Sequence, residues 1–194
     1  MNFETYKKRL FELASHKNAN NRSTTASYAS FENIVYKFLD NVYEMYLNAS
    51  TDERQEIRHI IKEHHIDSED LREGEPIPMP FSYLLNWYVI RAIKYLEATG
   101  QEIWLIRGLV AISMLDGIHY RPDDEEHLAL LYVAAEERGI NPKPIYQMIA
   151  KVSNNEPTKL GQVSTSELIG DIPTTAHEIV DKFRKMFMVK KENE

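Results

Sequence analysis

Three successive stretches between Phe81 and Gly139 repeat apolar residues at helix spacing, and each stretch ends at a glycine. The first ends at Gly100, the second is apolar on nearly every side and ends at Gly117, and the third ends at Gly139. Glycine just after a helix readily adopts the left-handed conformation that ends it. A helix that is apolar all round has to be surrounded by others, and short connections make neighbouring helices antiparallel. This part of the chain therefore predicts a packed helical core.

Helix spacing also recurs in the N-terminal part of the chain, over residues 3–13, 31–46 and 51–61. We expect Ser30 to be the N-cap of the second of these helices, because serine satisfies the free backbone N–H groups of a first turn. Ser50 is followed three residues later by a glutamate, which matches a capping box for the third helix. That third helix has few apolar residues, so we expect it to lie on the surface.

Turn-forming residues are scarce in the chain as a whole. Its 194 residues include seven glycines and eight prolines, so the chain is long enough to bury a core but has too few turns for an all-β sandwich. No repeat of fixed length indicates a solenoid. The sequence predicts an all-α fold, either an antiparallel helical bundle or a two-layer αα array, of about seven to nine helices.

We divide the chain into four segments that we expect to pack as one domain. Residues 1–65 form an N-terminal helical unit, 66–80 an acidic proline-rich connector, 81–152 the helical core, and 153–194 a polar loop and a C-terminal amphipathic helix. Prolines at alternate positions of the connector exclude a helix there. The C-terminal helix could pack on its own bundle or on a second copy, so the sequence leaves homo-oligomerisation open.

Several functional classes are excluded by residues that the chain lacks. Without cysteine it cannot be a disulfide scaffold, a zinc finger or a cysteine-dependent enzyme. It contains no glycine-rich phosphate loop and no nucleophile elbow, so we assign no catalytic residue and expect no cofactor. No apolar run reaches the roughly 20 residues of a membrane-spanning helix, and no leader is recognisable, so we expect a cytoplasmic protein without membrane contact.

The net charge of −7 is unevenly distributed. Acids outnumber basic residues nine to four over residues 51–75, and six to one over residues 123–139. An acidic surface disfavours nucleic-acid binding and attracts a basic protein partner. Consecutive acids also suit a helix N-terminus, which explains part of the second group without any ligand. The candidate partner-binding residues are His119, Tyr120, Arg121, Asp123, Asp124, Glu125, Glu126, Glu136 and Glu137.

These patterns favour a non-catalytic helical protein-binding module, such as an inhibitor, an immunity-type protein or an adaptor. The alternative is a metal- or small-ligand-binding bundle, with or without enzymatic activity, that uses His59 with Glu56 and Glu63, or the region from Asp116 to His127. Glu-x-x-His spacing places a carboxylate and an imidazole on one helix face, as in carboxylate-bridged metal bundles. The charged neighbours of His59 instead favour a solvated face of side-chain pairs, so we assign no metal ligand.

Arg91 and Arg107 lie within the two most apolar helices. Arginine is rarely buried without a partner. We expect each to reach the surface along its aliphatic stem or to form an ion pair between helices, with Glu97, Glu102, Asp116 or a helix C-terminus as candidate partners.

Aromatic residues fall beside several of the apolar stripes rather than within them. This position is typical of the edge of a core and also of an interface. This holds for several of the following residues: Tyr43, Tyr46, Tyr83, Trp87, Tyr95, Tyr120 and Tyr132.

Overall fold

The computed structural model describes residues 2–15, 25–65, 81–115 and 122–145 of the chain. Six helices lie within these ranges: α1 (Phe3–Ala14), α2 (Thr25–Asn48), α3 (Thr51–Glu63), α4 (Phe81–Thr99), α5 (Glu102–Leu115) and α6 (Pro122–Glu136). Residues 142–145 are also helical. The described part of the chain contains no strand, which confirms the predicted all-α fold. The predicted connector at 66–80 and the segment at 153–194 lie outside it, so the division of the chain into segments stays a prediction.

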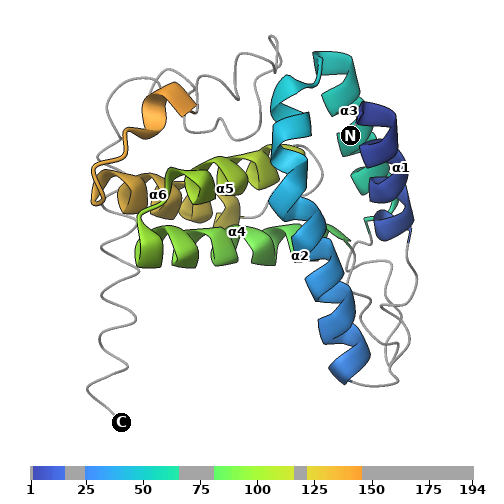
Figure 1. Ribbon diagram of the computed structural model, residues 1–194, viewed down its shortest axis with the longest axis horizontal. Coiled ribbons are helices and arrows are strands. Elements are labelled where there is room, and N and C mark those ends of the chain that lie inside the picture. The colour runs from blue at the N-terminus through green and yellow to red at the C-terminus, as the bar shows by residue number, and fades with distance from the viewer. Residues whose placement is uncertain (1, 16–24, 66–80, 116–121, 146–194) are drawn as a thin grey trace.

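The helices form two groups on either side of α2 (Figure 1). On one side α4, α5 and α6 pack on one another, and each successive helix reverses direction. On the other side α1 and α3 pack together, while α2 crosses α4 and α5 steeply. Among the described helices, none has the combination of length and apolar character needed to cross a membrane.

Helix α5 is the centre of the core, as its apolar sequence predicts. Ten of its fourteen residues are buried. A Cβ atom at Gly108 would lie 2.9 Å from a methyl carbon of Leu131, so the glycine lets α6 approach α5 closely. A buried hydrogen bond of 2.9 Å joins the Tyr46 hydroxyl of α2 to the Ser113 hydroxyl of α5, so one core extends across both groups of helices.

The predicted helix ends can be checked at Gly100, Gly139, Ser50 and Ser30. Gly100 and Gly139 have φ values of 63° and 71°, so both adopt the left-handed conformation that was expected of them. Gly117 lies outside the described residues. The capping box at Ser50 is confirmed, because its hydroxyl accepts from the backbone N–H of Glu53 and the Glu53 carboxylate accepts from the backbone N–H of Ser50.

The prediction of an N-cap at Ser30 is wrong. Helix α2 begins at Thr25, so Ser30 lies inside it. The apolar stripe that marks this helix in the sequence starts only at Phe31. The helix continues toward the N-terminus without that stripe, because residues of moderate helix propensity can extend a helix that is already formed.

Two arginines, Arg54 and Arg138, join neighbouring helices through hydrogen bonds to main-chain carbonyl groups. Arg54 of α3 is fully buried; its guanidinium carbon lies 4.6 Å from the ring centroid of Tyr46, and its Nη2 donates to the Leu47 carbonyl at 3.1 Å. Burial lowers the pKa of the Arg54 guanidinium. Arg138 donates to the Glu97 carbonyl through Nε at 2.9 Å and through Nη2 at 2.7 Å, which holds the end of α4 to the end of α6.

Candidate functional site

The predicted partner-binding residues do not form one described surface. His119, Tyr120 and Arg121 lie outside the described residues. Asp123, Asp124, Glu125 and Glu126 lie in the first turns of α6, as expected of consecutive acids, but their side chains are not described.

The remaining two predicted acids are at the other end of the same helix. Glu136 and Glu137 are exposed, and a Glu137 carboxylate oxygen lies 3.6 Å from an Arg138 nitrogen. At 1.5 Å per residue, Glu136 lies roughly 18 Å along α6 from Asp124. The two acidic groups of α6 are therefore separated by most of the length of the helix.

The residues of the metal-binding alternative come together only in part. His59 Nε2 lies 3.1 Å from a Glu63 carboxylate oxygen, and both side chains are exposed. Glu56 instead accepts a hydrogen bond of 2.9 Å from Lys7 of α1. Within the described ranges, no group of three or more potential metal-ligating side chains lies close enough to hold an ion.

Arg91 and Arg107 form the ion pair between helices that the sequence suggested, but with a different partner. Arg91 Nη1 donates to Asp40 Oδ1 at 3.0 Å, and the Tyr88 hydroxyl donates to the same oxygen at 2.7 Å. Arg107 Nη2 donates to the main-chain carbonyl of Asp40 at 3.0 Å, and its Nη1 lies 4.0 Å from Oδ1. Asp40 of α2 thus occupies the place expected for Glu97 or Glu102, while Asp116 lies outside the described residues.

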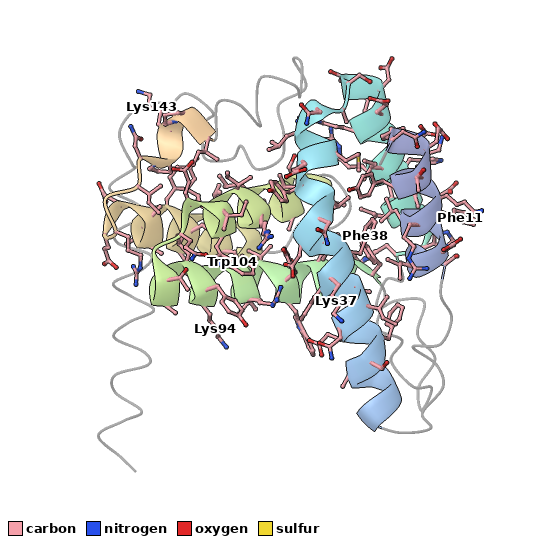
Figure 2. All side chains as sticks on the ribbon, viewed as in Figure 1. Phe11, Lys37, Phe38, Lys94, Trp104 and Lys143 are labelled. Atoms are coloured by element: carbon pink, nitrogen blue, oxygen red, sulfur yellow. The ribbon has the colours of Figure 1, made fainter. Side chains whose placement is uncertain are left out.

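Aromatic rings surround both guanidinium groups. The guanidinium carbon of Arg107 lies 4.6 Å from the ring centroid of Trp104 and 5.5 Å from that of Tyr43. The guanidinium carbon of Arg91 lies between 5.1 and 5.5 Å from four ring centroids, those of Tyr36, Tyr88, Tyr95 and Trp104. Tyr95 also stacks on Trp104, which lies between α4 and α5 in Figure 2. We name this group the Arg–aromatic cluster; it comprises Tyr36, Asp40, Tyr43, Tyr88, Arg91, Tyr95, Trp104 and Arg107.

The Arg–aromatic cluster has two cations and one carboxylate. Burial alone would lower the pKa of Arg91, but the hydrogen bond and the charge of Asp40 outweigh it and raise that pKa. Burial, and then the hydrogen bond to Asp40, raise the pKa of the Tyr88 phenol well above its ordinary value, so Tyr88 stays a neutral donor. The side chains of Arg91 and Arg107 are 26% and 19% exposed. Among the side chains of the cluster itself one positive charge is therefore in excess, and the Glu44 carboxylate lies at its edge, where it accepts a hydrogen bond of 2.9 Å from the Tyr43 hydroxyl.

Next to the cluster, α4 carries large apolar side chains on its outer side. Trp87, Ile90 and Tyr95 are 44%, 37% and 43% exposed. Lys94 is exposed as well and points away from the other helices in Figure 2. Their spacing of three, four and eight residues places them within about one half of the helix circumference. We name this surface the α4 face; it comprises Trp87, Ile90, Arg91, Lys94 and Tyr95.

Sequence reasoning found part of this surface. It singled out Trp87 and Tyr95 as aromatic residues beside an apolar stripe and Arg91 as an unusual cation, but it passed over Ile90 and Lys94. A helical projection would have found both, since they share the sector of Trp87. Asp40 also had a recognisable signal, because it is the one acidic residue between Glu32 and Glu44 in a helix with an apolar stripe.

No protein-family model, curated protein or solved structure matches this chain. Its function is therefore inferred from the Arg–aromatic cluster and the α4 face, which are contiguous because Arg91 and Tyr95 belong to both.

Proposed function

We propose that this protein is a non-catalytic helical protein-binding module and that the α4 face is the surface that contacts its partner. The observation that carries the proposal is the exposure of Trp87, Ile90 and Tyr95 together on one side of a helix. Single exposed apolar residues are ordinary, whereas a contiguous group marks an interaction surface. Tryptophan, tyrosine and arginine are also the residues most enriched at the energetic centres of protein interfaces.

The rigid support of this face favours the proposal. The opposite side of α4 is buried against α5 and α6 through residues such as Leu85, Val89 and Ala92. Arg91 is held by Asp40, and Tyr95 is stacked on Trp104. A surface whose side chains are already fixed loses less conformational entropy on binding. Such a module acts by covering or recruiting its partner, as an inhibitor, an immunity-type protein or an adaptor does. We place it in the cytoplasm, a reducing compartment that suits a chain without cysteine.

The test is a comparison of the proteins that bind to the wild-type chain and to Trp87→Ala, each immobilised in its full length. We expect at least one protein from the source cell to be retained by the wild type and lost with Trp87→Ala. Circular dichroism of both proteins checks that the variant is folded. Partners that are retained equally by both would contradict the proposal.

Ile34→Ala is the matched control. Ile34 is 42% exposed, close to the value for Trp87, but it lies on α2. It is two residues from Tyr36 of the Arg–aromatic cluster, so the two side chains lie on opposite sides of the helix. Binding that depends on the α4 face should survive this substitution.

The predicted attraction of a basic partner to the acids of α6 is a second candidate for the same function. Glu136 and Glu137 favour it, because both are exposed at the end of that helix. Reversal of their charges, together with those of residues 123–126, should abolish binding if the partner docks there. Binding that survives this reversal and is lost with Trp87→Ala would assign the interface to the α4 face.

A further inference from the structure

We propose that the partner docks on the α4 face through an acidic segment, and that one of its carboxylates pairs with Arg91 and Arg107 beside Asp40. This inference rests on the proposed function of the α4 face and specifies the chemistry of the partner. It is the reverse of the basic partner that the net charge of the chain suggests.

The first reason is the unequal number of charges in the Arg–aromatic cluster. Asp40 Oδ1 accepts hydrogen bonds from both Arg91 and Tyr88. Arg107 donates to the Asp40 main chain, and its Nη1 remains 4.0 Å from the carboxylate. Because a partly buried charge is stable only when it is compensated, a second carboxylate would complete this site.

The second reason is the geometry of the guanidinium groups. Aromatic rings pack around Arg91 and Arg107 and keep much of the surrounding water away. Both groups nevertheless remain partly exposed. A guanidinium has five N–H donors, and Asp40 takes one of those of Arg91. Charge-assisted hydrogen bonds from arginine to a carboxylate are strong, and they are stronger where the local dielectric constant is reduced.

The third reason is the charge of the surface around the cluster. Lys94 lies one turn beyond Ile90 and Arg91, and the one acidic residue of α4, Glu97, lies three residues further on, near the end of the helix. Like charges across an interface are costly, so a basic segment would be repelled here. Trp87 and Ile90 provide apolar contacts within one turn of Arg91. The complementary segment therefore combines acidic side chains with apolar ones.

The experiment is a selection of random twelve-residue peptides on the immobilised full chain, in parallel on the wild type and on Trp87→Ala. We expect the peptides that are enriched on the wild type and lost on Trp87→Ala to carry aspartate or glutamate next to apolar residues. Synthetic copies in which each acid is replaced by its amide should bind at least about tenfold more weakly, because a hydrogen-bonded charge pair is lost.

Variants of the protein locate the contact. Arg91→Gln should weaken the acidic peptide about tenfold or more, and circular dichroism checks that it is folded. Lys94→Gln, which removes an exposed cation with little risk to folding, should weaken binding about two- to fivefold. Lys8→Gln is the matched control, because Lys8 is an exposed cation on α1, which packs on α2 and α3. It should leave the affinity unchanged.

The outcomes separate this inference from the proposed function. If peptides depend on Trp87 but are neutral or basic, the acidic partner is wrong and the α4 face remains a binding surface. If no enriched peptide depends on Trp87, both proposals fail. If acidic peptides bind equally well to Arg91→Gln, Lys94→Gln and the wild type, the pairing with the arginines is wrong.

Discussion

The surface of α1 and α3 differs from the α4 face in how far its charged side chains are paired within the chain. On α1 and α3 side chains pair with one another within the chain, as Lys7 does with Glu4 and Glu56, and His59 with Glu63. On the α4 face the cations exceed the carboxylates near them. Acidic side chains of α3 thus have partners within the chain, while a largely apolar helix, α4, presents cations to solvent. Net charge along the sequence is therefore a poor guide to the surface that is available to a partner.

Arg54 and Arg91 differ in the same way, since the first is enclosed by the protein and the second reaches solvent. Arg54 and Arg91 both lie over tyrosine rings, at 4.6 Å and at distances of 5.1 Å or more. Arg54 is fully buried and donates to a main-chain carbonyl, whereas Arg91 shares a carboxylate and reaches solvent. The first arrangement fixes one helix on another; the second also leaves donors accessible.

The largest expected effect is therefore on stability, at Arg54. Arg54→Ala should lower the free energy of unfolding by about 3 kcal/mol, because a large buried side chain leaves a cavity. Urea denaturation measures the loss. Arg54→Met keeps the aliphatic stem and should be less destabilising than Arg54→Ala. A loss below about 1 kcal/mol for Arg54→Ala would show that this arginine does not hold α3 in place.

Asp40→Asn should have the next largest effect. It leaves two guanidinium groups without a carboxylate and should lower the free energy of unfolding by about 2 kcal/mol, less than for a fully buried pair because Asp40 is itself partly exposed. The same substitution releases Arg91, so the affinity for an acidic peptide should rise. Stability that falls while acidic-peptide affinity also falls would break the contrast between the two surfaces.

The pH dependence of the free energy of unfolding should show the raised pKa of Tyr88. Burial and Asp40 raise its pKa in the folded protein above the unfolded value of about 10. Its contribution to stability is complete below pH 10 and is lost as the pH rises further. Above pH 10 the difference in unfolding free energy between wild type and Tyr88→Phe should shrink by about 1.4 kcal/mol per pH unit. Parallel pH profiles of the two proteins would contradict the environment described for this phenol.

The smallest expected effect is at the paired charges of α3. Glu63→Gln breaks an exposed i,i+4 pair with His59 and should change the free energy of unfolding by less than about 0.5 kcal/mol. Because Glu56 is engaged with Lys7, zinc should not raise the melting temperature of the wild type. A zinc-dependent rise that disappears in Glu63→Gln would favour the metal-binding alternative.

Much of the fold follows from local rules in the sequence. Apolar spacing locates α4 and α5, and glycines mark the chain just after α4 and α6, since both signals arise within a single helix. The start of α2 at Thr25 escapes such reasoning, because a helix can extend beyond its apolar stripe.

The site is less predictable than the fold for a geometric reason. Arg91 signals an ion pair from within its own helix, but Asp40 lies 51 residues away on a helix whose crossing with α4 no local pattern specifies. Tyr43 is partly buried, whereas Trp87 and Tyr95 are exposed, although all three stand beside apolar stripes. The difference depends on which side of each helix is covered by another.

The two tryptophans lie in different environments, so their intrinsic fluorescence can report separately on binding and on unfolding. Trp87 is 44% exposed on the α4 face, and Trp104 is buried against Tyr95, Arg91 and Arg107. An indole in water emits at longer wavelength than an indole in an apolar environment. A partner that covers the α4 face should therefore shift the emission of Trp87 to the blue, whereas unfolding should shift that of Trp104 to the red. With only two tryptophans in the chain, binding and unfolding become distinguishable by the direction of one spectral change, without any attached dye.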